Sequence, residues 1–186
     1  MARSVLGRGT ARERVLEAAM ALFGEHGVNG TSLQMIAARL GVGKAAVYYQ
    51  FRSKEDLVLA VVEPIYDDMA RLVTIAEALS TAEARRDVVV SGLIEMCVRH
   101  RRLAAVLYGD PAVDSLVQSR PELAATVEQF TALVTGGNLD THGRVILAMI
   151  VNGIYTAAID PNLADISDAD LLQSLQAGTR HLIKML

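Results

Sequence analysis

The chain has 186 residues, of which 52% are hydrophobic and 4% aromatic, and its formal net charge is −3. This length suits one or two domains with a sizeable core, and the many Ala and Leu residues favour packed helices. No apolar run approaches 18 uncharged residues, so we expect no membrane partner. A single cysteine, Cys97, excludes an internal disulfide and fits a reducing compartment. Arg3 and Arg8 are not followed by the apolar stretch of a secretion signal, so the sequence predicts a cytoplasmic protein.

The charges are unevenly distributed along the chain. Residues 1–54 contain eight Lys/Arg and three Asp/Glu, a net charge of +5, whereas residues 55–186 carry a net charge of −8. A basic N-terminal module on an acidic body can bind a polyanion, although an ordinary solvated basic face would look the same. Residues 1–9, with Arg3 and Arg8, form either a flexible tail or an arm that reaches a minor groove.

The first predicted helix follows Thr10, which forms a capping box with Glu13, and it ends at Gly27. Thr31 and Gln34 form another capping box before a short helix that Gly41 ends. A second short helix spans residues 44–50. Apolar residues form a wedge between the two short helices: Ile36, Leu40, Val42, which packs in the turn, and Val47. This arrangement is a helix-turn-helix, with residues 44–50 offered to the major groove.

The same stretch resembles the DNA-binding signature of the tetracycline-repressor (TetR) family of bacterial transcription regulators. The resemblance rests on residues spread from the first short helix to the start of the next long one: Thr31, Ile36-Ala37, Gly41-Val42, Tyr48, Phe51, Ser53-Lys54 and Leu57. In that family, the residue before the phenylalanine is most often histidine, whereas here it is Gln50. Because both residues are polar, we expect this difference to matter little. The resemblance covers roughly residues 10–57. Beyond it, only the helical character and the length agree with the family.

We therefore expect an all-α protein with two domains. Residues 1–54 form a three-helix, helix-turn-helix DNA-binding domain, and residues 55–186 form a helical regulatory, ligand-binding and dimerisation domain. The residues expected to contact operator DNA lie at the starts of two helices and along the recognition helix between them: Thr31, Ser32, Gln34, Lys44, Ala45, Ala46, Tyr48, Tyr49 and Lys54. We expect Thr31, Ser32 and Gln34, together with Lys54, to bind phosphates of the DNA backbone. The recognition helix is expected to contact base edges. The resemblance implies that Tyr48 contacts the DNA backbone.

The next predicted helix runs from Lys54 to about Leu79, and Pro64 predicts a kink near residues 60–64. Ser80 and Glu83 predict the start of the following helix. The pair Asp67-Asp68 is expected on a solvated face. Further helices follow Asp110-Pro111 and run from Pro121 to Gly136-Gly137.

The last two predicted helices, residues 141–159 and about 168–185, are more apolar than one buried stripe requires. Gly153 and Gly178 would let neighbouring helices approach closely. We therefore expect them to pack against a second copy, and the family resemblance implies a four-helix homodimer interface. Burial in a monomer is the alternative. A dimer would place two recognition helices about 34–36 Å apart on a palindromic operator.

The resemblance also implies a small-molecule effector, which we expect to be largely apolar and to bind in the body. Candidate lining residues mix apolar and polar side chains: Tyr66, Met69, Met96, His100, Tyr108, Phe130, Asn152 and Tyr155. His100 and Asn152 are the most informative, because a buried polar group needs a partner. No catalytic constellation, metal site or cofactor motif is recognisable, so we expect no enzyme. A helical enzyme and a dimeric protein-interaction module remain the alternatives to an operator-binding repressor.

Overall fold

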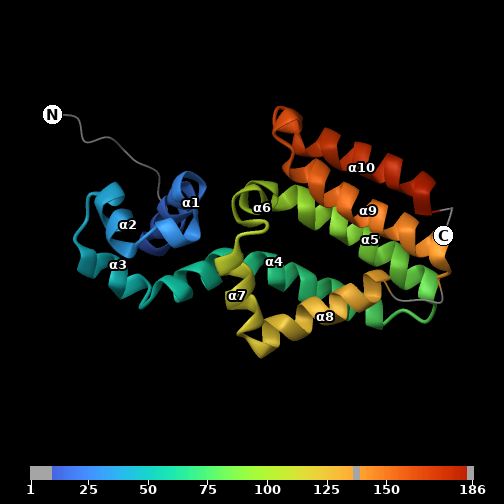
Figure 1. The fold of residues 1–186 in the computed structure, drawn as a ribbon, viewed down its shortest axis with the longest axis horizontal. Coiled ribbons are helices and arrows are strands. Elements are labelled where there is room, and N and C mark those ends of the chain that lie inside the picture. The colour runs from blue at the N-terminus through green and yellow to red at the C-terminus, as the bar shows by residue number, and fades with distance from the viewer. Residues whose placement is uncertain (1–9, 136–138, 184–186) are drawn as a thin grey trace. The chain divides into compact units, whose positions relative to one another are not determined.

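The computed structural model describes residues 10–135 and 139–183, and within these ranges every regular element is helical (Figure 1). The predicted all-α class is therefore confirmed. The elements follow one another in the order α1 (Ala11–Gly30), α2 (Leu33–Leu40), α3 (Lys44–Gln50), α4 (Lys54–Glu77), α5 (Ala82–Arg99), α6 (Arg101–Leu107), α7 (Pro111–Gln118), α8 (Pro121–Thr135), α9 (Thr141–Ile159), the 3-10 helix η1 (Pro161–Leu163) and α10 (Asp168–Ile183). The N-terminal arm, the predicted stop at Gly136-Gly137 and the predicted end of the final helix at about residue 185 lie outside the described residues.

Helix caps explain most of the element boundaries. The Thr10–Glu13 capping box is present at α1, and the N–H of Asp56 donates to Ser53 Oγ over 3.0 Å at the start of α4. Two predicted caps are wrong by one residue. Ser32, not Thr31, caps α2, by accepting from the Met35 N–H over 3.2 Å, and Thr81, not Ser80, caps α5. Ser and Thr can both act as N-caps, so the sequence alone does not decide which of two adjacent hydroxyl residues caps the helix.

The chain forms two compact units. The first contains residues 1–62 together with residues 106–116, and the second contains residues 63–105 and 117–186. The division along the chain thus falls within α4, α6 and α7. Helix α4 continues through Pro64, and the kink expected there stays a prediction.

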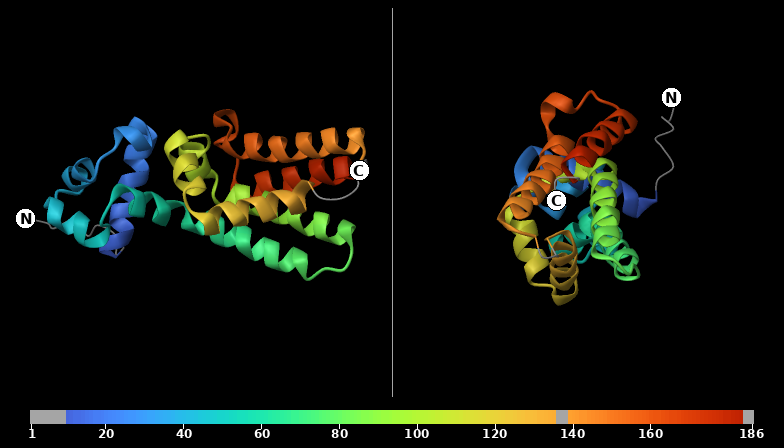
Figure 2. Two further views of the ribbon diagram at one scale, coloured as in Figure 1. Left: turned by 60° about the horizontal axis from the view of Figure 1, so that its bottom comes forward. Right: turned by 90° about the vertical axis from the view of Figure 1, so that its right-hand side faces the viewer.

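In the second unit, α5 is the central helix, with α9 and α10 lying side by side along it (Figures 1 and 2). Val89, Leu93 and Ile154 are almost fully buried in the core that these helices share. Helix α5 also crosses α4 closely, because a Cβ atom built on Gly92 would lie 2.1 Å from the Cδ2 atom of Leu72. Glycine is therefore required at this crossing unless Leu72 moves.

Helix α9 is unusually apolar for a helix that is only partly buried. Of the described helices, it is the one long and apolar enough to cross a membrane by length and composition, and 33% of it is buried inside the protein. A core helix passes the same test. Its bounds agree with the predicted range of residues 141–159.

Candidate nucleic-acid interface and effector groove

The helix-turn-helix is built from α2 and α3 packed on α1. Ile36 and Val47 are fully buried between the helices. Gly41 has φ 65° and ψ 30°, a left-handed conformation that glycine adopts without strain, and the Val42 N–H donates to the Ala37 carbonyl over 3.0 Å. The expected packing of Val42 in the turn is wrong, because its side chain is 38% exposed. The turn is therefore held by backbone hydrogen bonds rather than by that side chain.

Helix α3 presents a broad exposed face. Only Val47 of this helix is buried, whereas Tyr49 is 87% exposed and Tyr48 is 42% exposed. The Lys44 ammonium lies 5.2 Å from the centre of the Tyr48 ring, a cation–π contact. Lys44, Ala45 and Ala46 are also exposed. The recognition residues predicted on α3 thus lie together and are accessible to a ligand.

The predicted phosphate contacts at the start of α2 divide into two kinds. Ser32 and Gln34 are exposed. Thr31 is only 3% exposed, and its hydroxyl donates to the Gly27 carbonyl over 2.9 Å. The accessible side chains at this helix end are therefore those of Ser32 and Gln34.

Lys54, the first residue of α4, is held by the main chain after α1. Its ammonium donates to the Val28 carbonyl over 3.1 Å and to the Asn29 carbonyl over 3.4 Å. An ammonium has three donors, so one remains for a further acceptor.

Two other basic residues of this unit have structural contacts. Arg39 Nη2 lies 2.7 Å from both carboxylate oxygens of Glu25, and the Arg12 guanidinium lies 5.0 Å from the centre of the Phe51 ring. These contacts tie α2 to α1 and the start of α1 to Phe51, the residue that follows α3.

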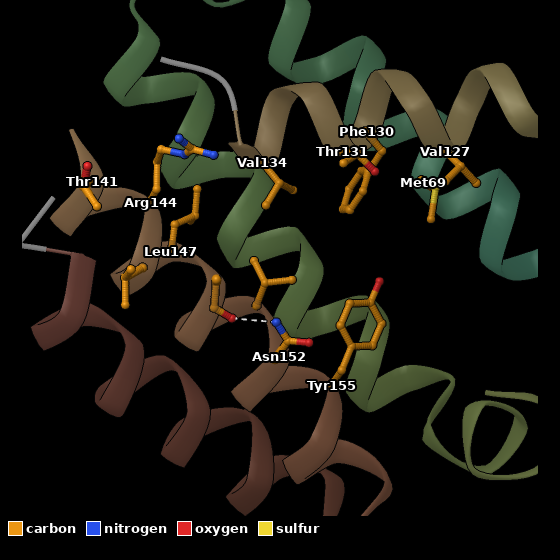
Figure 3. A pocket seen from close by; sticks show the side chains of 13 residues that line it. Met69, Val127, Phe130, Thr131, Val134, Thr141, Arg144, Leu147, Asn152 and Tyr155 are labelled. Carbon is orange, nitrogen blue, oxygen red and sulfur yellow. Dashed lines mark hydrogen bonds between the residues drawn. The ribbon is translucent and has the colours of Figure 1, made fainter. Parts of the chain in front are cut away.

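The second unit contains a groove of about 930 Å³ between α8 and α9 (Figure 3). Four of the eight predicted ligand-binding residues line it: Met69, Phe130, Asn152 and Tyr155. The Asn152 amide donates to the Ala148 carbonyl of its own helix over 2.8 Å. Thr131 and Arg144 also line the groove and were not predicted. Of the described lining residues, Arg144 alone is charged at neutral pH.

The other four predicted ligand-binding residues do not line this groove. Tyr66, Met96 and His100 lie elsewhere in the second unit, and Met96 is buried in its core. Tyr108 is 60% exposed and belongs to the first unit. The apolar periodicity of the sequence could not separate groove positions from core positions, because both face inward.

His100 instead takes part in a charge cluster around Asp68. Its Nε2 atom lies 2.7 Å from Asp68 Oδ2, Arg99 Nη1 donates to the same oxygen over 2.9 Å, and Arg71 pairs with Asp68 Oδ1. The expected solvated position of Asp68 is wrong, since this residue is only 7% exposed. Burial acts to raise the pKa of Asp68, but hydrogen bonds from His100 and Arg71 and the charge of Arg99 hold the pKa below its ordinary value of 3.8.

Cys97 is also buried in the second unit, and burial raises the pKa of its thiol to about 12. The thiol therefore stays protonated and unreactive at neutral pH. In the described ranges, no group of three His, Cys, Asp or Glu side chains could hold a metal ion.

The chain has relatives of known class. Residues 15–61 match the family model described as "Bacterial regulatory proteins, tetR family". The HTH-type transcriptional dual regulator CecR of Shigella flexneri is 47% identical over 57 residues, which are 31% of this chain and 25% of CecR. The HTH-type transcriptional repressor BepR of Brucella suis is 25% identical over 176 residues, which cover 81% of each chain. For three curated relatives, the match spans 53%, 25% and 38% of the relative's own length, so the chain spans about half of them or less.

The fold is also that of solved regulators. The structure of the ketosteroid transcriptional regulator KstR2 of Mycobacterium tuberculosis aligns with a TM-score of 0.69 at 19% identity, covering 98% of this chain and 97% of that one. At this identity, the similarity establishes the fold alone. The helix-turn-helix segment, residues 15–61, thus matches that of the tetR family of bacterial regulatory proteins, and the chain that carries it has the fold of solved regulators.

Proposed function

We propose that the protein is a cytoplasmic, DNA-binding transcriptional regulator that acts as a repressor and is not an enzyme. The observation that supports this most directly is the exposed face of α3 on a module whose net charge is +5 over residues 1–54. Phosphate attraction supplies most of the affinity in such modules. The name of BepR, a repressor, favours repression.

In the proposed complex, α3 lies in the major groove of the operator. Lys44 donates to guanine O6 and N7, the methyl groups of Ala45 and Ala46 pack on thymine methyls, and Tyr49 contacts a base edge. Tyr48 contacts the DNA backbone. Residues 1–54 act as the DNA-binding domain and residues 55–186 as the regulatory domain.

Phosphates are bound at the starts of α2 and α4. The N-terminus of α2 donates N–H groups to a phosphate, with the side chains of Ser32 and Gln34 beside it. Thr31 supports this site from its buried position, through its bond to Gly27. Lys54 offers its remaining donor to a second phosphate.

We propose a homodimer formed by α9 and α10. Val145 and Met149 of α9 are 53% and 59% exposed, and Gly153 follows on the same face with nothing within 4 Å of a Cβ atom built on it. Gly178 of α10 is equally open. An exposed apolar stripe next to open glycines suits close packing against a second copy of the same two helices.

The groove between α8 and α9 is the proposed effector site. Its apolar walls, which include Met69, Phe130 and Val134, favour a largely apolar molecule, and Arg144 favours an acidic group at one end. The effector weakens operator binding by favouring a different conformation of the second unit. By linkage, operator DNA must then weaken effector binding by the same factor.

Selection of bound sequences from a random DNA pool tests the proposed function. We expect an enriched sequence, with affinity that falls steeply as salt increases. Lys44→Ala should weaken binding to the selected sequence by about 1–3 kcal/mol and relax its preference at one position. Arg102→Ala removes an exposed positive charge from the second unit and should leave binding unchanged.

The same experiment separates the alternatives. A dimeric protein-interaction module would bind no DNA even at low salt, and it would enrich no sequence. If the Lys44→Ala variant binds the selected sequence with the same affinity and the same sequence preference as the unaltered protein, Lys44 takes no part in base recognition. For the effector, a molecule that occupies the groove yet leaves operator affinity unchanged at saturation would contradict its proposed role.

A further inference from the structure

The main chain at the end of α1 contains a break that needs support. Gly27 has φ 71° and ψ 167°, so the helix is interrupted there and the Val28 N–H leaves the regular helical pattern. Val28 is only 2% exposed. A buried N–H group without an acceptor is costly, so this one requires a partner.

The partner comes from a residue 82 positions later in the chain. Asp110 Oδ2 accepts from the Val28 N–H over 3.2 Å, while Asp110 Oδ1 accepts from the Ala112 N–H over 2.9 Å at the start of α7. Gly109, with φ 74°, turns the chain immediately before it. One carboxylate therefore holds two main-chain segments, and both belong to the first compact unit.

The same short segment is held from its other side by the residues that lead into α2 and α4. The Val28 carbonyl accepts from Lys54 Nζ and, over 3.2 Å, from the Thr31 N–H. The Thr31 hydroxyl donates to the Gly27 carbonyl. Residues 27–31 are thus fixed between Asp110 and Lys54, and Ser32, which caps α2, follows directly.

We propose that Asp110 is a positioning residue for DNA binding, although it lies about 60 residues beyond the helix-turn-helix. By accepting the Val28 N–H, it fixes residues 27–31 and with them the position of the α2 N-terminus, which must meet a phosphate. This inference rests on the proposed DNA-binding function.

The test uses the full chain carrying Asp110→Asn. Asparagine has the same shape but one acceptor oxygen instead of two, so either the Val28 or the Ala112 N–H loses its partner. Asp110→Ser is a second variant, because serine is an equally good N-cap for α7 but has a single, shorter oxygen. The matched control is Asp114→Asn, which removes the same charge from an exposed position one turn later in α7.

Two quantities are measured: affinity for the selected operator, and amide hydrogen exchange of peptides that span residues 27–34. We expect both Asp110 variants to bind the operator roughly tenfold more weakly, which is about 1.4 kcal/mol, and to exchange faster in this segment. Asp114→Asn should resemble the unaltered protein in both measurements.

Unchanged affinity in the Asp110 variants would overturn the inference, as would an equal loss in Asp114→Asn, which would indicate a general effect of charge. Weaker binding without faster exchange in residues 27–34 would also contradict it, because the segment would then be held without Asp110. If the unaltered protein binds no DNA, the proposed function fails instead, and the exchange data still decide whether Asp110 holds the segment.

Discussion

Asp68 is the residue at which sequence and structure differ most. In the sequence it is one of two adjacent acidic residues in a predicted helix, a pattern typical of a solvated face. In the structure, Asp67 is exposed while Asp68 is buried against Arg99 and His100 of the α5 end. These partners are more than 30 residues away, so only the tertiary fold shows which of the two carboxylates is paired.

The buried carboxylate makes stability depend on pH. Because the pKa of Asp68 is lowered in the folded state, its stabilising contribution is fully present above the ordinary value of 3.8 and is lost as the pH falls through the lower, folded-state pKa. Asp68→Asn should lower the free energy of unfolding by about 1–3 kcal/mol at pH 7, and this difference should narrow below about pH 3.8.

Denaturant unfolding of both proteins at several pH values measures this difference. Asp67→Asn is the control, since its exposed carboxylate should contribute little. Equal stability of Asp68→Asn and the unaltered protein at pH 7 would show that the cluster does not stabilise the fold.

At the scale of elements, local chemistry predicts where helices begin and end. The Thr10–Glu13 capping box, Gly41 and Asp110-Pro111 predict helix boundaries that the structure confirms, because these residues act on their own backbone neighbours. The cap of α2 was misplaced because Thr31 turns inward to Gly27, which depends on the break in α1. Only four of the eight predicted ligand-binding residues line the groove. A helix face that lines a groove has the same apolar periodicity as one that packs in a core, so the sequence does not separate the two.

The open glycines allow a direct test of the proposed dimer helices. Gly178→Leu places a bulky side chain where the single protomer has open space. Leucine has the better helix propensity, so the free energy of unfolding of the protomer should rise. In a dimer packed through this face, the same side chain should weaken association at least tenfold, by about 1–3 kcal/mol.

Sedimentation over a range of concentrations measures the association. Gln173→Leu, an exposed position on another face of α10, is the matched control. A Gly178→Leu protein that remains as dimeric as the control would place the interface elsewhere.

At the scale of the whole molecule, the proposed regulation of DNA binding depends on the segments that connect the two compact units. The chain passes between its two compact units within α4, α6 and α7. The predicted domain boundary at residues 54/55 lies at the start of α4, but residues 106–116 are distant in sequence from the helix-turn-helix and carry no pattern that assigns them to its unit. Their assignment depends on contacts such as that between Asp110 and Val28.

In the proposed function, a dimer reads a palindromic operator through two copies of α3. The most direct test compares the affinity and stoichiometry of the protein on the selected inverted repeat and on a single half-site. We expect two protomers on the full repeat, with half-sites about 34–36 Å apart and much tighter binding than to one half-site. Binding of one protomer with equal affinity to both DNAs would contradict this account.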